Sequence, residues 1–397
     1  MFKIPYEEYK FRINNIYNLM EKYQLDGIYI SNPVNIKYFL GVHYLQTERP
    51  LAIIFHKNGN VYFFGPIIEK EHFKSQCNFI SEFFTYLDYP GEVHPFKKFV
   101  EWFNELNFLD KNIGVDNINF YSNYWGFKGI NISELFKFNK IYNIFDELYD
   151  LRKIKSSNEI ELIKESIKWG NLAHRLLQDY TEEGLFDWVI SAKASLEASI
   201  VMKKTLGRDY IPTTTGIFPV SAGFRGQVGE HSAFPHSVSI ERPLKIGDIL
   251  GTGANADIDG YHSELERNLF LGKPNEKFEK YHKIAIKMQK AAMEKLKPLN
   301  KFSDADKAAL KIAKDEGVLD FVLHHSGHNI GLEAHEAPFL DIGDQTEIKP
   351  GMVLTVEPGI YIPGVGGFRH SDTVLITEEG AKMLTYYPSE IEYLTII

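Results

Sequence analysis

Two short segments near the carboxyl end of the chain do most to limit its possible folds. The first, SGHNIGLEAHEAP from Ser326, places His328 and His335 seven residues apart, among glycines that permit close backbone approach. The second, TVEPGIY from Thr355, puts Glu357 at the end of the apolar run MVLTV, as in a buried strand that delivers a carboxylate to a cleft. Either segment alone fits a core histidine or a turn-flanking glutamate. Together they indicate a functional site.

These segments resemble the creatinase, prolidase and methionine aminopeptidase family (M24), whose catalytic domain has the pita-bread fold. Three more stretches are similar to family segments: LRKIKSSNEIELIKES from Leu151, GDILGTGANADIDGYHSELERNLFLG from Gly247 and GGFRHSDTVLIT from Gly366. The resemblance is strong from residue 151 onward and weaker before it. It implies an α+β protein, with a smaller α/β creatinase-type domain over 1–150 and a pita-bread catalytic domain over 151–397.

The metal-ligand positions implied by this resemblance are altered. Gly253 and Glu264 stand where the family has two metal-binding aspartates, and Ser371 stands where it has a bridging glutamate. Glycine has no donor and a serine hydroxyl is a poor ligand for first-row divalent metals, so we expect no dinuclear centre. One Zn, Mn or Co ion held by Glu264, His328 and Glu357 stays open, because histidine with two carboxylates is a known zinc set.

Another segment resembles creatinase, the metal-free member of the family. SELERNLF is similar to its ALERTLF, in which the glutamate before the arginine holds the substrate, and Glu266 and Arg267 match this pair. Alternation along a strand would put Glu264 and Glu266 on one face. Creatinase also uses a histidine eleven residues before its GD turn as proton shuttle, and His236 matches it. Four other histidines lie in the same segments and match no family ligand as well: His231, His324, His325 and His370.

The resemblance therefore implies a hydrolase that cleaves a carbon–nitrogen bond in a small, carboxylate-bearing substrate. His236, Glu266 and Glu357 would be catalytic, and His328, His335 and Arg267 would bind substrate. One alternative is an Xaa-Pro dipeptidase or aminopeptidase that uses one divalent metal ion. Another is a catalytically silent module that binds peptides, as this fold does in some chaperone and ribosome-associated proteins.

The resemblance also implies a homodimer. Creatinase-like dimers use an arginine of the amino-terminal domain to grip the substrate carboxylate. Arg49, in QTERPLAIIF, sits in the weakly matching segment. Its planar guanidinium suits this part because it pairs bidentately with a carboxylate.

Composition excludes several other classes. The net charge is −9 and the chain has no basic tract, which argues against nucleic acid or an anionic membrane as partner. The single cysteine, Cys77, cannot form an intramolecular disulfide. No apolar run reaches the roughly 18 residues of a spanning helix and no amino-terminal signal pattern is visible, so we expect a cytoplasmic protein.

Local patterns predict several elements. Residues 6–23 have helical spacing, DGIYIS from Asp26 is typical of a buried strand, and Asn58-Gly59 between two apolar runs predicts a hairpin. Ser156 with Glu159 forms a capping-box pattern that begins a long helix. Two later amphipathic helices should end near Pro298 and Gly317, outside a curved antiparallel sheet. The glycine-spaced segment GFRGQVG from Gly223 lacks the context of a phosphate-binding loop.

Overall fold

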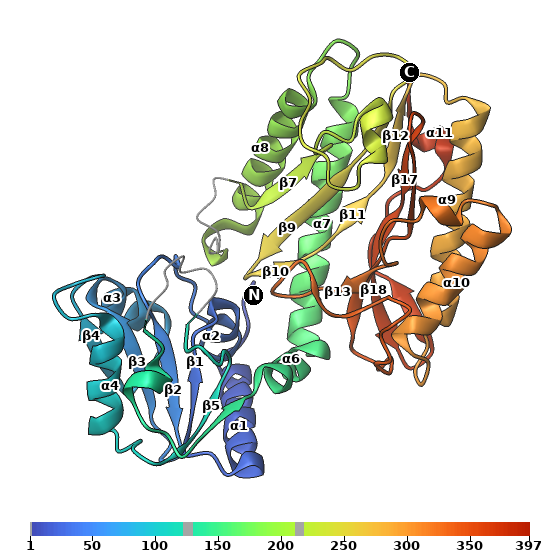
Figure 1. The fold of residues 1–397 in the computed structure, drawn as a ribbon. Coiled ribbons are helices and arrows are strands. Elements are labelled where there is room, and N and C mark those ends of the chain that lie inside the picture. Colours follow the sequence, from blue (N-terminus) through green and yellow to red (C-terminus); the bar gives the residue numbers. More distant parts are fainter. Residues whose placement is uncertain (1, 122–129, 211–217) are drawn as a thin grey trace. The chain divides into compact units, whose positions relative to one another are not determined.

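The computed structural model describes residues 2–121, 130–210 and 218–397. Its contacts divide the chain into two compact units, Ile4–Leu151 and Arg152–Ile397, the second of which also includes the first residues of the chain. Figure 1 shows both units, each with its own sheet. In the described residues no helix has the length and apolar character needed to cross a membrane. The cytoplasmic location expected from the sequence stays a prediction.

The first unit is a mixed α/β layer. Its six-stranded sheet has the order β4-β3-β2-β1-β5-β6, with parallel and antiparallel neighbours. Its elements are α1 (Tyr6–Tyr23), β1 (Gly27–Ile30), α2 (Pro33–Leu40), β2 (Ala52–His56), β3 (Val61–Pro66), α3 (Ile67–Gln76), β4 (Glu82–Tyr86), α4 (Pro95–Glu105), β5 (Asn112–Val115), α5 (Ile132–Leu135), β6 (Lys140–Asn143) and α6 (Phe145–Lys153).

Local sequence signals in this unit are confirmed. The helix expected over residues 6–23 is α1, and the strand expected after Asp26 is β1. The Asn58-Gly59 turn joins β2 and β3, which pair antiparallel, and Gly59 has φ 92°. Aromatic side chains fill the core between the sheet and α4. Phe64 on β3, for example, lies edge-on to Phe99 with ring centroids 5.3 Å apart.

The second unit packs long helices against curled antiparallel strands. Its helical segments are α7 (Ser157–Asp179), α8 (Asp187–Leu206), η2 (Gly207–Asp209), η3 (Gly229–Ala233), α9 (Glu276–Lys295), α10 (Phe302–Asp315), η4 (Leu319–Phe321) and α11 (Ile391–Leu394). Its strands are β7 (Val220–Gly223), β8 (Ile249–Gly251), β9 (Gly253–Ile258), β10 (Tyr261–His262), β11 (Leu265–Glu266), β12 (Asn268–Leu271), β13 (His328–Asn329), β14 (Glu336–Phe339), β15 (Val353–Val356), β16 (Gly359–Ile362), β17 (Gly366–Arg369), β18 (Ser371–Thr377), β19 (Gly380–Met383) and β20 (Thr395–Ile396).

The helices of this unit form where the sequence predicts them. Ser156 caps α7 with the reciprocal bonds of a capping box to Glu159, as expected. The helices expected before Pro298 and Gly317 are α9 and α10, and Gly317 has φ 71° just past the end of α10. Figure 1 shows α7 and α8 on one side of the strands and α9 and α10 on the other.

The largest sheet brings distant segments together. Its main path is β10-β9-β11-β18-β15-β13-β14, with β7 added on β9 and β19 on β18, and its described pairings are antiparallel. In this order the SELER segment on β11 lies beside β18, β18 beside β15, and β15 beside β13. Glu266, His328 and Glu357 thus lie on or directly beside adjacent strands.

Candidate active site

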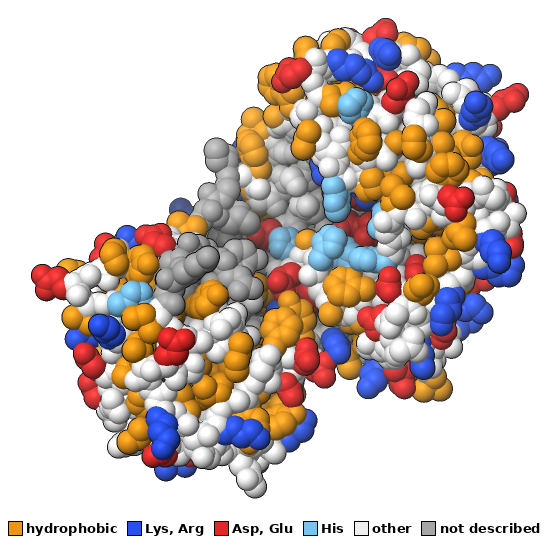
Figure 2. Space-filling model, in the orientation of Figure 1, with side chains coloured by type: hydrophobic (Ala, Val, Ile, Leu, Met, Phe, Trp, Pro, Cys, Tyr) orange, Lys and Arg blue, Asp and Glu red, His pale blue; other side chains and the backbone are white. Residues whose placement is uncertain are grey.

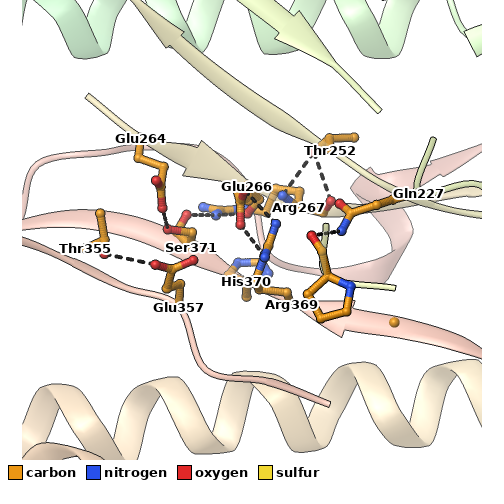
Figure 3. A network of polar contacts seen from close by, with 12 residues as sticks. Gln227, Thr252, Glu264, Glu266, Arg267, Thr355, Glu357, Arg369, His370 and Ser371 are labelled. Atoms are coloured by element: carbon orange, nitrogen blue, oxygen red, sulfur yellow. Dashed lines mark hydrogen bonds and ion pairs between the residues drawn. The ribbon is translucent and has the colours of Figure 1, made fainter. Parts of the chain in front are cut away.

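Three carboxylates and two histidines converge at the ends of these strands. Glu266 on β11 pairs in register with Ser371 on β18, and Glu357 directly follows β15. Figure 3 shows Glu264, Glu266 and Glu357 on neighbouring strands, with Ser371 between Glu264 and Glu357. One ligand oxygen from each of the three glutamates lies within 4.8 Å of the others. The expectation that Glu264 and Glu266 share a face agrees with this geometry.

His328 is the centre of the cluster. Its ring is fully buried, and Nδ1 donates to the Asn329 carbonyl oxygen at 2.9 Å. This bond orients the ring so that Nε2 faces the carboxylates, 3.0 Å from Glu357 Oε1 and 4.0 Å from Glu264 Oε2. The Glu357 contact lacks the alignment of a hydrogen bond. His335, which is exposed, stacks on His328 with ring centroids 3.9 Å apart.

The pKa values of Glu264, Glu357 and His328 are shifted in different directions by their surroundings. Burial raises the pKa of Glu264, and the nearby charges of Glu357 and Glu266 raise it further. Burial would also raise the pKa of Glu357, but contact with His328 and the charge of Arg369 lower it instead. Burial alone would lower the pKa of His328, yet the Glu357 contact and both carboxylate charges raise it to about 9. Near neutral pH, therefore, Glu357 and His328 form an ion pair beside a carboxyl group that holds its proton more readily.

Glu266 is already paired with two arginines. The Arg369 guanidinium grips both oxygens, through Nη2 to Oε1 at 2.7 Å and through a close Nε contact to Oε2. Arg225 Nη2 donates to the same Oε1 at 2.5 Å. Neither arginine was expected from the sequence to belong to the site, although Arg225 lies in the segment GFRGQVG and Arg369 in GGFRHSD. Glu266 thus pairs with cations of the protein itself, whereas the resemblance to creatinase implied that it holds a substrate.

Arg267 has a different part from the one expected. Its five N–H donors are all occupied: Nε by Pro388 O, Nη1 by Glu266 O and Ser371 O, and Nη2 by Tyr387 O and Asp372 Oδ1. The side chain is 2% exposed. Arg267 therefore ties β11 and β18 to the segment that follows β19, and no donor remains for a substrate.

Two other predicted residues lie elsewhere. His236 is exposed in the loop that follows η3. Across the described parts of the chain, no hydrogen bond or ion pair joins it to Glu264 or Glu357, and its role as proton shuttle stays a prediction. Arg49 belongs to the first unit, where Nε binds Asp88 Oδ1 at 2.7 Å and Nη1 binds Glu48 Oε1 at 2.8 Å.

The remaining histidines of these segments differ in their surroundings. His324 is partly buried, donates through Nδ1 to the His325 carbonyl oxygen at 2.7 Å, and accepts at Nε2 from the Tyr361 hydroxyl at 2.8 Å. Burial lowers the pKa of His324, so this ring is neutral. His370 is buried, and neither ring nitrogen has a hydrogen-bond partner among the described residues. His231 is exposed. Figure 2 shows several histidine side chains grouped near the middle of the view, with acidic side chains beside them.

Comparison with known proteins gives the family. The model described as "Metallopeptidase family M24" matches residues 161–378, and the one described as "Creatinase/Prolidase N-terminal domain" matches residues 12–148. The chain belongs to metallopeptidase family M24. An Xaa-Pro dipeptidase of Pyrococcus furiosus is 31% identical to this M24 protein over 387 residues, which span 96% of this chain and 99% of that one.

Solved structures agree with this assignment. The prolidase from Pyrococcus furiosus matches with a TM-score of 0.74 and 29% identity, over 94% of this chain and 99% of that one. The Xaa-Pro dipeptidase from Bacillus anthracis matches with a TM-score of 0.78 and 24% identity, over 98% and 100%. The expected α+β architecture, a creatinase-type amino-terminal domain followed by a pita-bread domain, is confirmed.

Among the described residues of this M24 protein, some clustered side chains could hold a metal ion. Glu264, His328 and His335 each offer a ligand atom, and these atoms lie within 4.8 Å of one another. One carboxylate with two imidazoles is a known catalytic zinc set, and the Nδ1 bond of His328 is the usual orienting contact of a ligating histidine. Gly253 offers no donor for a second ion, and the Ser371 hydroxyl is engaged with Glu264 Oε1 at 2.7 Å. This set differs from the expected one by His335 in place of Glu357, and Glu357 also lies close by.

Proposed function

We propose that this M24 protein hydrolyses a carbon–nitrogen bond in a small, carboxylate-bearing substrate, without a dinuclear metal centre. The observation that carries the proposal is the juxtaposition of Glu264, Glu357 and His328, with Gly253 and Ser371 where the family resemblance requires two more carboxylates. The relatives named Xaa-Pro dipeptidase support an Xaa-Pro dipeptide as substrate, and the SELERNLF segment supports a creatine-like amidine. Both are small and both carry a carboxylate.

The geometry supports Glu264 as a proton carrier. A carboxyl group with a raised pKa can give its proton to a leaving nitrogen near neutral pH, while its neighbour Glu357, with a lowered pKa, stays ionised and orients the reacting groups. His328 keeps Glu357 in place through the 3.0 Å ion pair. His236, the shuttle expected from the sequence, is the competing candidate for the same proton.

The second candidate function is an Xaa-Pro peptidase that uses one metal ion. Glu264, His328 and His335 would hold the ion, which would polarise the scissile carbonyl and lower the pKa of its bound water. In this case the protein residues still bind and orient the dipeptide, and Glu357 supports the set through His328. The observation that favours it is the buried Nε2 of His328, aimed at two carboxylates without an aligned hydrogen bond.

One experiment separates these candidates. Turnover of Xaa-Pro dipeptides and of creatine is measured for the wild type, with and without chelator, and for Glu264→Gln and His236→Ala. If Glu264 carries the proton, Glu264→Gln lowers kcat by about 10²- to 10⁴-fold, His236→Ala has little effect, and chelator changes nothing. Loss of activity with chelator would show that hydrolysis depends on a metal ion, and a larger loss in His236→Ala than in Glu264→Gln would make His236 the shuttle. Specific peptide binding without hydrolysis of any of these substrates would favour the silent binding module instead.

We also propose that the protein is a homodimer in which Arg49 reaches the partner's substrate carboxylate. The support is the creatinase-type amino-terminal domain and the position of Arg49 in its matching segment. Arg49 is held by Asp88 and Glu48 in this chain, so it would exchange these partners for a substrate. Light scattering after gel filtration should give twice the 45.7 kDa chain mass. A monomer at assay concentration would contradict this proposal.

A further inference from the structure

The turn that follows β7 holds an arginine in an unusual backbone conformation. Gln227 N donates to Phe224 O at 2.8 Å, which closes a four-residue turn. Its central residues, Arg225 and Gly226, have φ 52° and 70°, the pattern of a type I′ turn that glycine, asparagine and aspartate favour. Glycine is required at the second position, because a Cβ there would lie 1.6 Å from Val238 O. Arginine at the first position is strained, and such strain is found where a side chain must be aimed.

The side chain of Arg225 lies over Gly253. Strands β7 and β9 pair antiparallel with Gly223 opposite Gly253, so the turn begins directly beside that glycine. A Cβ added at Gly253 would lie 3.5 Å from Arg225 Cζ, 3.5 Å from Arg225 Nη2 and 3.5 Å from Glu266 Oε1. The methylene alone would fit, but a carboxylate directed the same way would meet the guanidinium. Gly253 is the position where the family resemblance requires the first metal-binding aspartate.

The charge of Arg225 also belongs to the acidic cluster. Its Nη2 is bound to Glu266 Oε1, and within the described residues this is the one hydrogen bond that its guanidinium makes. The Arg225 side chain is half exposed, whereas that of Glu266 is 5% exposed. A guanidinium remains charged at every accessible pH and carries five N–H donors, so most donors of Arg225 stay available on the open side.

We propose that the Arg225 guanidinium takes the place of one metal ion of an M24 site. It neutralises the cluster of Glu264, Glu266 and Glu357, and it presents its remaining N–H groups to a carbonyl or carboxylate oxygen of the substrate. The contact between Arg225 and a substrate oxygen rests on the proposed function. Fixed N–H donors aimed at an oxygen that gains negative charge do the electrostatic work that a metal ion would otherwise do.

Counting bound metal ions tests the first part of this proposal, that Arg225 takes the place of a metal ion, without an activity assay. Gly253→Asp/Ser371→Glu restores the two carboxylates, and this background is compared with Arg225 kept and with Arg225→Ala. Each protein is checked by circular dichroism, incubated with MnCl₂, passed through gel filtration and analysed by elemental mass spectrometry. With Arg225 kept, the count should equal that of the wild type, and with Arg225→Ala it should rise by one ion per chain. Equal counts in the two variants would overturn the proposal.

Two further variants control for a change in net charge and for failure of the multiple variants to fold. Arg208→Ala, on the same background, removes an exposed arginine of η2 and should add no ion, which separates a local effect from a change in net charge. If the multiple variants fail to fold, single Arg225→Ala is titrated with MnCl₂ by calorimetry. Its affinity should exceed that of the wild type by at least about tenfold, because the acidic cluster loses a neighbouring cation. An unchanged affinity would also overturn the proposal.

Kinetic measurements test the second part of the proposal, that the N–H groups of Arg225 contact a substrate oxygen. For a wild type that hydrolyses an Xaa-Pro dipeptide, Arg225→Ala should lower kcat by about 10²- to 10³-fold, the usual effect of removing an oxyanion donor. Arg225→Lys should restore part of the rate, because it returns the charge without the planar fork. Unchanged kinetics in Arg225→Ala would overturn the substrate contact. If the wild type hydrolyses none of these dipeptides, the proposed function fails on that substrate class, while the metal counts still decide the place of Arg225.

Discussion

Glu336→Gln should destabilise the second unit strongly, because Glu336 is the shared anion of a buried ion triad. Arg152 Nη2 lies 2.5 Å from Glu336 Oε1 and Lys155 Nζ lies 2.9 Å from Oε2. The three side chains are between 1% and 3% exposed. The substitution keeps the shape of the side chain but leaves two buried cations short of an anion, which costs about 3–5 kcal/mol in comparable cases.

The pKa of Glu336 gives an independent magnitude. Burial would raise it, but the charges of Lys155 and Arg152 lower it from 4.5 to about 2. This lowering corresponds to roughly 3 kcal/mol, at about 1.36 kcal/mol per pH unit. Between these two pH values the unfolded chain binds the proton and the folded chain does not. The stabilisation is therefore complete above about pH 4.5 and is lost as the pH falls toward 2.

Urea unfolding followed by circular dichroism, fitted for two units, measures this effect. The matched control is Glu333→Gln, because Glu333 also contacts Arg152, at 2.7 Å, but its side chain is 25% exposed. The control should cost under about 1 kcal/mol. Glu336→Gln should also remove the stability change between pH 4.5 and 2. Equal effects of the two substitutions, or a loss below about 1 kcal/mol for Glu336→Gln, would refute the reasoning.

Two other predictions concern buried polar groups near the site. Burial, with a contribution from the charge of Arg267, lowers the pKa of His174 to about 3, so below pH 6.5 the unfolded state binds a proton that the folded state does not. His174→Phe should therefore make the free energy of unfolding fall less steeply on acidification, by about 1.4 kcal/mol per pH unit. Melting temperatures measured between pH 6 and 4 follow this change. The same pH dependence in the variant and the wild type would contradict the prediction. Ser371→Ala removes the 2.7 Å hydrogen bond that lowers the pKa of Glu264, so that pKa should rise by up to about one unit in the pH–rate profile, and no rise would contradict the assigned contact.

Local features of this protein could be predicted from the sequence because neighbouring residues determine them. The bounds of α1, the capping box at Ser156 and the turn at Gly59 depend on side chains a few positions away. The convergence of Glu264, His328 and Glu357 was also expected, but from the family resemblance, since no local pattern places three distant segments on adjacent strands.

The partners of Glu266 and Arg267 could not be predicted in this way. Glu266 meets Arg225 because β7 pairs with β9 in a register that puts Gly223 opposite Gly253, and it meets Arg369 from the end of β17. Two of the five N–H donors of Arg267 bind carbonyl groups of Tyr387 and Pro388, about 120 residues along the chain. These contacts depend on the pairing of strands that are far apart in the sequence. A residue-by-residue match to creatinase assigns a role to Glu266 or Arg267 but does not show which side chains surround it in this protein.

The altered ligand positions and the presence of Arg225 and Arg369 are both consistent with the net charge of the glutamate cluster. When Glu264 is ionised, the three clustered carboxylates carry three negative charges, and the guanidinium groups of Arg225 and Arg369 with a protonated His328 supply three positive ones. Two divalent ions would add four more with no added carboxylate to offset them. One ion that displaced the His328 proton would leave an excess of a single charge, which a carboxylate substrate would neutralise. Restoring the two carboxylates alone, or removing Arg225 alone, should therefore leave the number of bound ions unchanged.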